Sequence, residues 1–211
     1  MIGALIMTAA LMGSSAASET GFDRPDLLAL AEPAVQAELA SADQHVLVVR
    51  HARKISPDCN GMSCPLSAQG EAMVARLGAL IGAEPVDRAY ASAACRTRLT
   101  AAAGGRDVVA HQAVDGYAQD CTEGETISRL RAEAFEETRT DPVRWTLAGE
   151  HSNTSCLWMI EFAGAEAAGE AGCNAEGRLE ETAYGDVFWL YRTGEDWHLT
   201  VLRGAFEVEA E

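Results

Sequence analysis

A histidine surrounded by basic residues follows a short apolar run in the first quarter of the chain. The run Val46–Val49 leads directly into Arg50 and His51. Such a run predicts a buried parallel strand, and ligands of open α/β sheets bind at the carboxyl ends of these strands. Neutral imidazole attacks phosphorus well, and guanidinium groups hold phosphate oxygens in bidentate pairs. The segment therefore predicts phosphate chemistry, although a strand that merely ends in surface basic residues would look the same.

Two later strand ends carry residues of the same kind. Val86–Ala91 predicts a strand that ends at Ser92, and the helix that follows carries Arg96 near its start. A phosphate at this point would meet both the guanidinium and the positive end of the helix dipole. Val143–Ala148 predicts another strand, which is followed by His151. All three strand ends are expected to face one crevice.

The elements between these strands are mostly helical. Apolar residues recur at helical spacing after Ser67, which is a suitable N-cap, and further helices are expected over 125–138 and 156–162. The Gly/Ala/Glu-rich segment 163–177 looks like a surface excursion. Asp186–Tyr191 and Trp197–Leu202 flank a glycine-containing turn and predict a hairpin. The predicted fold is a three-layer α/β/α sandwich, with a mostly parallel central sheet and a C-terminal β-hairpin.

The composition restricts the choice of partners. The chain has 211 residues, which suits one domain, and its formal net charge is −16. Nucleic acids and anionic membranes are bound by excess Lys and Arg, so neither is an expected partner. The acidity is best explained by solubility, and the basic cluster stands out against it.

The N-terminal residues suggest export. Residues 1–18 combine a short apolar stretch with small residues that a signal peptidase reads, and the stretch is too short to span a bilayer. No Lys or Arg precedes Arg24, so a misplaced start codon or an apolar tail would also fit. The expected organisation is a signal peptide over 1–18, a lead-in with one short helix over 19–44 and a domain over 45–206. The mature protein would then be periplasmic or secreted.

The cysteines agree with an oxidising compartment. Cys59 and Cys64 bracket a turn-forming loop and predict a local disulfide, whereas the other four cysteines, Cys95, Cys121, Cys156 and Cys173, could supply two more or stay reduced. No Cys-x-x-Cys pair occurs, and no spacing of His, Cys, Asp or Glu suggests a metal site.

Several motifs in this order resemble the histidine phosphatase superfamily, the phosphoglycerate-mutase-like proteins, and in particular its small bacterial members with an Arg-His-Ala-x-Lys motif. The most specific piece is the Ser-x-x-x-Arg-Thr-x-x-Thr-Ala run. The matching pieces are Arg50–Lys54, Leu66–Gly70, Ser92–Ala101, His151–Thr154 and Tyr184–Phe188. The resemblance extends over about 45–206.

The resemblance implies a reaction and a role for each residue. His51 would attack phosphorus and become a phosphohistidine, which water then hydrolyses. Arg50 and Arg96 would clamp the phosphate oxygens, and His151 would stabilise their charge. Lys54 lies where relatives keep a supporting cation, although a solvated surface lysine would fit equally well. The expected activity is hydrolysis of a small phosphomonoester without a cofactor or metal. Neither the identity of the substrate nor the oligomeric state can be read from the sequence.

Two features depart from the family pattern. Relatives usually have glycine directly before the second histidine, but here Glu150 follows Gly149. Because a carboxylate beside the site would repel phosphate, Glu150 should either point outward into solvent or serve as the acid, and we expect it to point outward. The general acid matches no sharp pattern either. Asp115 is our candidate; Asp120 and Glu123 are alternatives in the same loop.

These departures leave two other functions open. The chain could be a phospho-ligand binding protein that kept the pocket but lost turnover. It could also be a disulfide-stabilised envelope interaction module, in which the histidines at the strand ends are incidental. Phosphate affinity and turnover distinguish the three hypotheses.

Overall fold

The computed structural model describes residues 22–112, 129–179 and 184–209, together with Cys121 and the backbone of 118–119 and 126–127. The proposed signal peptide over 1–18 lies outside these residues.

A six-stranded sheet forms the centre of the molecule, with the strand order β3-β2-β6-β1-β7-β8. The first four strands in this order are parallel, β7 is antiparallel to β1, and β7 and β8 form the predicted hairpin. The strands are β1 (Gln44–Arg50), β2 (Arg88–Ser92), β3 (Val108–His111), β6 (Trp145–Glu150), β7 (Val187–Thr193) and β8 (Asp196–Leu202). A separate small sheet pairs β4 (Ala118–Gln119) with β5 (Thr126–Ile127).

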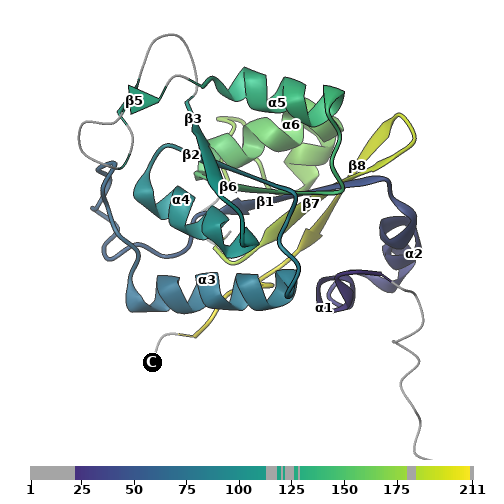
Figure 1. The fold of residues 1–211 in the computed structure, drawn as a ribbon, viewed down its shortest axis with the longest axis horizontal. Helices are drawn as coiled ribbons and strands as arrows, with labels where there is room; N and C mark the ends of the chain where they lie inside the picture. The colour runs from purple at the N-terminus through teal and green to yellow at the C-terminus, as the bar shows by residue number, and fades with distance from the viewer. Residues whose placement is uncertain are drawn as a thin grey trace, which may run out of the picture.

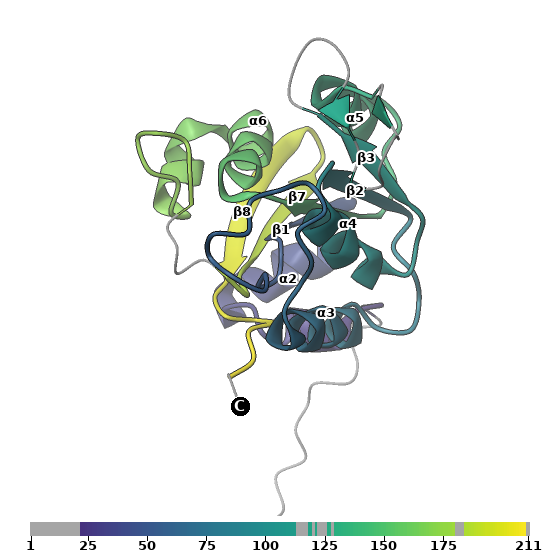
Figure 2. The same cartoon turned by 90° about the vertical axis from the view of Figure 1, so that its left-hand side faces the viewer.

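Helices cover both faces of the sheet, as a three-layer sandwich requires. The helices are α1 (Pro25–Leu28), α2 (Pro33–Ser41), α3 (Ala68–Ile81), α4 (Cys95–Ala101), α5 (Arg131–Thr140) and α6 (Ser152–Glu170), and a short 3-10 turn, η1 (Ala102–Gly104), follows α4. α5 and α6 lie on one side of the sheet, and α1 to α4 lie on the other (Figure 1). The view along the perpendicular direction shows the same separation of α3 from α6 (Figure 2).

The buried strand β1 supplies both halves of the core. Successive side chains of a strand point to opposite faces, so Leu47 and Val49 pack with α1 to α3, whereas Val46 and Val48 pack with α6. All four side chains are fully buried. The buried strand predicted from the apolar run Val46–Val49 is therefore confirmed.

The lead-in segment is more structured than predicted. It contains two short helices, α1 and α2, rather than one. A proline stands at the start of each, where its missing N–H costs nothing. Leu27 and Leu39 are fully buried against the α3 side of the sheet, so the lead-in is part of the core.

The prediction for 163–177 was wrong in part. α6 continues through Glu170, with a break at Gly164 where φ is +89°, and Ala168 and Ala171 are buried. The helix predicted over 125–138 also begins later, at Arg131, after the short strand β5. Alanine-rich composition alone did not distinguish a surface excursion from a helix that packs through small side chains.

Two disulfides are present. The predicted Cys59–Cys64 bridge closes a loop before α3, and Cys156–Cys173 ties α6 to the turn that follows it. Such bridges are compatible with an extracytoplasmic protein. None of the helices among the described residues combines the length and apolarity needed to cross a bilayer.

Candidate active site

The register of the sheet brings the two predicted histidines together. β1 and β6 are parallel neighbours in which Arg50 pairs with Glu150, so the next residues, His51 and His151, lie side by side. The backbone N–H of His51 donates to the Glu150 carbonyl over 2.7 Å and extends the ladder by one step. The centroids of the two imidazole rings are 5.3 Å apart. The two histidines therefore converge at one end of the sheet.

Helix α4 brings Arg96 to the same point. The Arg96 Nε donates to Nε2 of His51 over 3.3 Å. The Thr100 hydroxyl accepts from the backbone N–H of Ala52 over 2.9 Å and so fixes α4 to the segment after β1. Gly149 permits this approach, because a Cβ there would lie 2.5 Å from the Thr97 carbonyl oxygen.

The hydrogen bonds of His51 define its tautomer. Nδ1 lies 2.8 Å from the Ala52 carbonyl oxygen, which can only accept, so Nδ1 carries the proton. Nε2 then keeps its lone pair and accepts from Arg96. Burial lowers the pKa of His51 to about 3, assisted by His151 and the nearby guanidinium groups, although the bond to Ala52 opposes this shift. Burial and Arg96 likewise lower the pKa of His151 to about 4. In the free protein the site therefore holds two neutral imidazoles at neutral pH.

These shifts predict that His51 and His151 stay neutral in mildly acidic solution. At about pH 5.5 a histidine with an ordinary pKa would be mostly protonated, but these two rings should keep the ¹⁵N shifts of neutral imidazole. Because both folded-state pKa values lie below the unfolded value, unfolded chains bind protons first, and stability should fall as the pH drops below about 6.5. ¹⁵N NMR of the free protein measures the shifts, and a titration midpoint near the ordinary value would contradict the prediction.

Arg50 projects toward a pocket beside the histidines. Its guanidinium carbon lies 3.9 Å from the centre of the Tyr184 ring, and its Nη2 donates to the Tyr184 hydroxyl over 3.2 Å. The Tyr184 ring centroid is 5.9 Å from that of His51. The open pocket has a volume of about 520 Å³, and its lining includes Arg50, Arg53, Lys54, Ser67, Gln69 and Tyr184.

Lys54 lies on the rim of this pocket. Its ammonium donates to the Asn60 side-chain oxygen over 2.6 Å and to the Pro57 carbonyl over 2.7 Å. Partial burial and the positive charges of Arg96 and Arg50 lower the pKa of Lys54. Lys54 lines the same pocket as Arg50 and therefore lies beside the same site.

Comparison with known proteins agrees with this geometry. The sequence profile of the histidine phosphatase superfamily (branch 1) matches residues 46–154, a span that includes Arg50, His51, Arg96 and His151 but not Tyr184. The chain belongs to this superfamily. No curated protein matches the chain significantly.

Solved structures of the same superfamily fold resemble the chain at low sequence identity. Phosphoglycerate mutase from Bacillus anthracis is 14% identical and has a TM-score of 0.53, with 80% of this chain and 97% of that chain covered. A protein from Escherichia coli K-12, named as a candidate alpha-ribazole-5'-P phosphatase, is 16% identical with a TM-score of 0.51, and 79% of this chain and 99% of that chain are covered. These likenesses show a phosphoglycerate-mutase-like fold.

The expectation that Glu150 points into solvent was wrong. Its side chain is fully buried, on the face of the sheet that α6 covers. One carboxylate oxygen lies 2.8 Å from Nε2 of His111 and accepts from the Trp158 indole over 2.7 Å, and the other accepts from the Ser92 hydroxyl. Successive side chains of an extended segment point to opposite faces of the sheet. Glu150 and His151 are neighbours in the chain, so their side chains lie on opposite faces.

The buried carboxylate of Glu150 is ionised. Burial alone would raise the pKa of Glu150, but His111, Arg131 and the Ser92 hydroxyl outweigh burial and lower the pKa to about 2. Its charge is thus compensated within the core, and it slightly favours protonation of His151. Ser92 also lies 3.2 Å from the Thr154 hydroxyl, which accepts from the backbone N–H of His151. A chain of hydrogen bonds therefore connects Glu150 with the backbone of the second histidine.

Several predicted residues are not placed. Asp115, Asp120 and Glu123 lie outside the described residues. Within the part of the chain that the structure describes, no group of three or more His, Cys, Asp and Glu side chains could hold a metal ion.

Sequence reasoning missed three residues that shape the site. Tyr184 was part of a motif without a role, yet its ring stacks under Arg50. His111 and Arg131 were given no role, but both lower the pKa of Glu150. The contact between His111 and Glu150 becomes visible only from the register of β2, β3 and β6. Ser92 pairs with His111, and Ala91 pairs with Gly149, the residue before Glu150. The signal available beforehand was that Tyr184 belongs to one of the matching motif pieces, Tyr184–Phe188.

Proposed function

We propose that the protein is a phosphomonoesterase that acts through a phosphohistidine. The observation that carries this proposal is the neutral His51, whose Nε2 lone pair faces the buried Arg96 guanidinium and the His151 ring. Neutral imidazole is nucleophilic, and the surrounding cations would neutralise charge on the transferred oxygens. Membership of the histidine phosphatase superfamily supports the same reaction.

Two steps would complete the turnover. His51 Nε2 attacks phosphorus, the ester P–O bond breaks, and the leaving oxygen takes a proton from a carboxylic acid, for which we propose Asp115. Water then attacks the phosphohistidine and gives a proton to the Asp115 carboxylate, the P–N bond breaks, and inorganic phosphate and free His51 are released. Arg50, Arg96 and His151 are proposed to hold the oxygens in both steps, with Lys54 as a supporting cation. A bound phosphate dianion would raise the pKa of His151 and favour its charged form.

The pocket beside Arg50 is proposed to receive the alcohol portion of the ester. Its volume of about 520 Å³ lies in the range of small-molecule sites, which supports a small phosphorylated substrate. Arg50, Arg53 and Lys54 contribute positive charge, and no carboxylate lines the pocket among the described residues. A leaving group with an acidic substituent would suit this lining better than a cationic one.

We also propose that the mature protein works outside the cytoplasm. The apolar N-terminal stretch and the two disulfides support export, with residues 1–18 as the cleaved signal.

Turnover of 4-nitrophenyl phosphate tests the proposed function. The purified protein should hydrolyse this ester in the presence of EDTA, and vanadate should inhibit competitively, because vanadate adopts the trigonal-bipyramidal geometry of phosphoryl transfer. Phosphate binding without turnover would contradict the proposal in favour of a phospho-ligand binding protein. Absence of both phosphate binding and turnover would favour the envelope interaction module.

A further inference from the structure

We propose that the Cys59–Cys64 disulfide is a positioning element of the phosphate site. It closes loop 59–64. Two of the cations proposed to bind phosphate, Arg96 and Lys54, lie outside this loop and donate hydrogen bonds to it. The inference rests on the proposed function for the role of these cations and goes beyond it by assigning a role to the disulfide.

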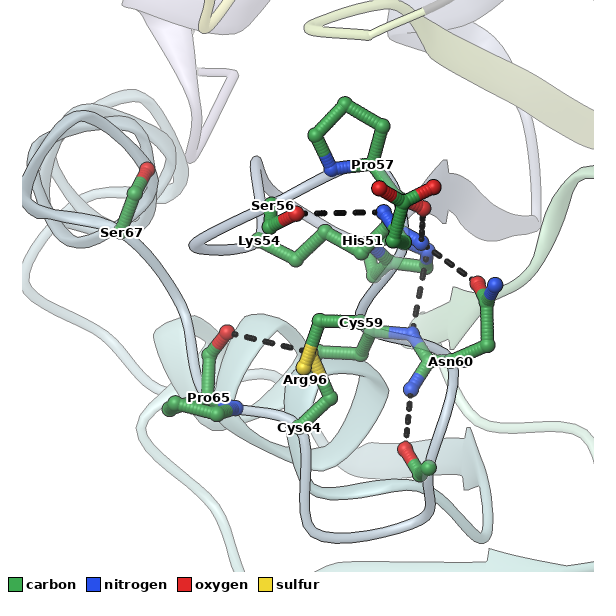
Figure 3. Close-up of a disulfide and its surroundings, with 12 residues drawn as sticks. His51, Lys54, Ser56, Pro57, Cys59, Asn60, Cys64, Pro65, Ser67 and Arg96 are labelled. Carbon is green, nitrogen blue, oxygen red and sulfur yellow. Dashed lines mark hydrogen bonds between the residues drawn. A yellow bond between two sulfur atoms is a disulfide. The ribbon is translucent and has the colours of Figure 1, made fainter.

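The loop touches the start of α4 at two consecutive residues. The Arg96 Nη1 donates to the Gly61 carbonyl oxygen over 2.9 Å. The backbone N–H of Cys95 donates to the Met62 carbonyl oxygen over 2.8 Å. Figure 3 shows the Arg96 guanidinium between the loop and the His51 ring. Since Nε of the same guanidinium donates to His51, the loop fixes the orientation of the plane that faces the nucleophile.

The same loop fixes a second cation. The Lys54 ammonium donates to the Asn60 side-chain oxygen, and Asn60 directly follows the first cysteine of the bridge. The Pro57 carbonyl, just before the bridge, accepts from the same ammonium. Figure 3 shows the bond from the Lys54 ammonium to Asn60, which lies in the loop closed by the disulfide. One closed loop therefore positions groups from two different elements.

Few buried side chains anchor this loop in the protein. Of residues 55–65, only Cys64 is buried, and Ile55 and Met62 are exposed. Its internal hydrogen bonds are short-range, from Cys59 N–H to the Ser56 carbonyl, from Cys64 N–H to the Gly61 carbonyl and from Asp58 N–H to the Ser56 hydroxyl, apart from one that joins the Ile55 N–H to the Pro65 carbonyl at the ends of the loop. A loop without an apolar anchor depends on cross-linking to limit its conformations.

Loss of the bridge should therefore weaken phosphate binding more than it weakens the fold. The buried Arg96 would keep its place on α4, but its Gly61 acceptor would become mobile, and part of the binding energy would be spent on ordering the loop. The second disulfide, Cys156–Cys173, joins α6 to the turn after it and contacts neither cation through any described hydrogen bond. It is the matched control within this chain.

The test compares two double variants, Cys59→Ser/Cys64→Ser and Cys156→Ser/Cys173→Ser. Affinity for inorganic phosphate and for vanadate is measured by calorimetry, and the melting temperature is measured in parallel. We expect at least about tenfold weaker binding by the first variant and a change below about twofold in the second, whatever their melting temperatures. Equal affinities of wild type and the Cys59/Cys64 variant, or equal losses in both variants, would overturn the inference.

The Arg96→Ala background separates positioning from general structural damage. If the loop acts through Arg96, the Cys59/Cys64 substitutions should weaken vanadate binding by less than about threefold in that background. A full tenfold loss there would contradict action through Arg96. Wild type that binds phosphate without turnover would contradict the proposed function alone, because the affinity comparison would still be measurable.

Reversible reduction provides the same comparison if the Cys59/Cys64 variant does not fold. The protein carrying Cys121→Ser, Cys156→Ser and Cys173→Ser is treated with a dithiol, which supplies two electrons and two protons to the Cys59–Cys64 bond and is itself oxidised to a disulfide. Phosphate affinity should fall about tenfold and return on reoxidation. Unchanged affinity in protein shown by mass spectrometry to be reduced at Cys59 and Cys64 would overturn the inference.

Discussion

Replacing His51 with alanine should lower kcat for 4-nitrophenyl phosphate by at least about 10⁴-fold, because loss of a nucleophile removes the covalent route altogether. The fold should survive, since the backbone bonds of this position to Glu150 and its neighbours do not need the imidazole. Phosphate binding should persist at reduced affinity, because Arg50 and Arg96 remain. Stopped-flow or steady-state release of nitrophenolate measures the loss.

His198→Ala is the matched control for this substitution. His198 lies in β8 and stacks on Tyr191, on a strand that does not contribute to the site. Its removal should change kcat by less than about twofold. If His51→Ala retained more than about a tenth of wild-type turnover, His51 could not be the nucleophile.

Replacing Glu150 with alanine should lower the free energy of unfolding by about 3–5 kcal/mol. The carboxylate accepts from Trp158 and Ser92 and faces the fully buried His111 and the nearly buried Arg131. Removing it would leave these groups without their acceptor inside the core, which costs far more than a surface pair is worth. Urea unfolding at neutral pH measures the change.

Glu161→Ala is a suitable comparison, because it removes the same charge from a largely exposed ion pair with Arg139 and should cost less than about 1 kcal/mol. The double variant Glu150→Ala/His111→Ala should be less destabilised than the sum of its single variants. Each single variant leaves the remaining residue of the pair buried without its partner, whereas the double variant removes both. A loss below about 1 kcal/mol in Glu150→Ala would contradict the buried, ionised state of this carboxylate.

Chemistry that depends on short sequence runs was predictable. The apolar run before His51, the helix start around Arg96 and the hairpin at the C-terminus all follow from local patterns, and the structure has them. The convergence of His51, Arg96 and His151 followed from a general rule, because the carboxyl ends of parallel strands lie at one edge of the sheet. The superfamily and the fold class were predicted correctly on these motifs.

Features that depend on register were not predictable. Which face Glu150 occupies depends on the register of β6, and its partners come from four elements, β2, β3, α5 and α6. The contact between Gly61 and Arg96 likewise joins a loop to a helix through a backbone carbonyl, which leaves no mark on residue type. Repulsion by a carboxylate was a sound physical argument, but it assumed that Glu150 had only solvent to turn to.

The most direct test of the phosphohistidine account is a crystal structure of the protein with vanadate. We expect vanadium bonded to Nε2 of His51, with its equatorial oxygens held by Arg50, Arg96 and His151 and its apical oxygen directed toward the pocket beside Tyr184. Vanadate bound elsewhere, or bound at this site without a bond to His51, would contradict the account.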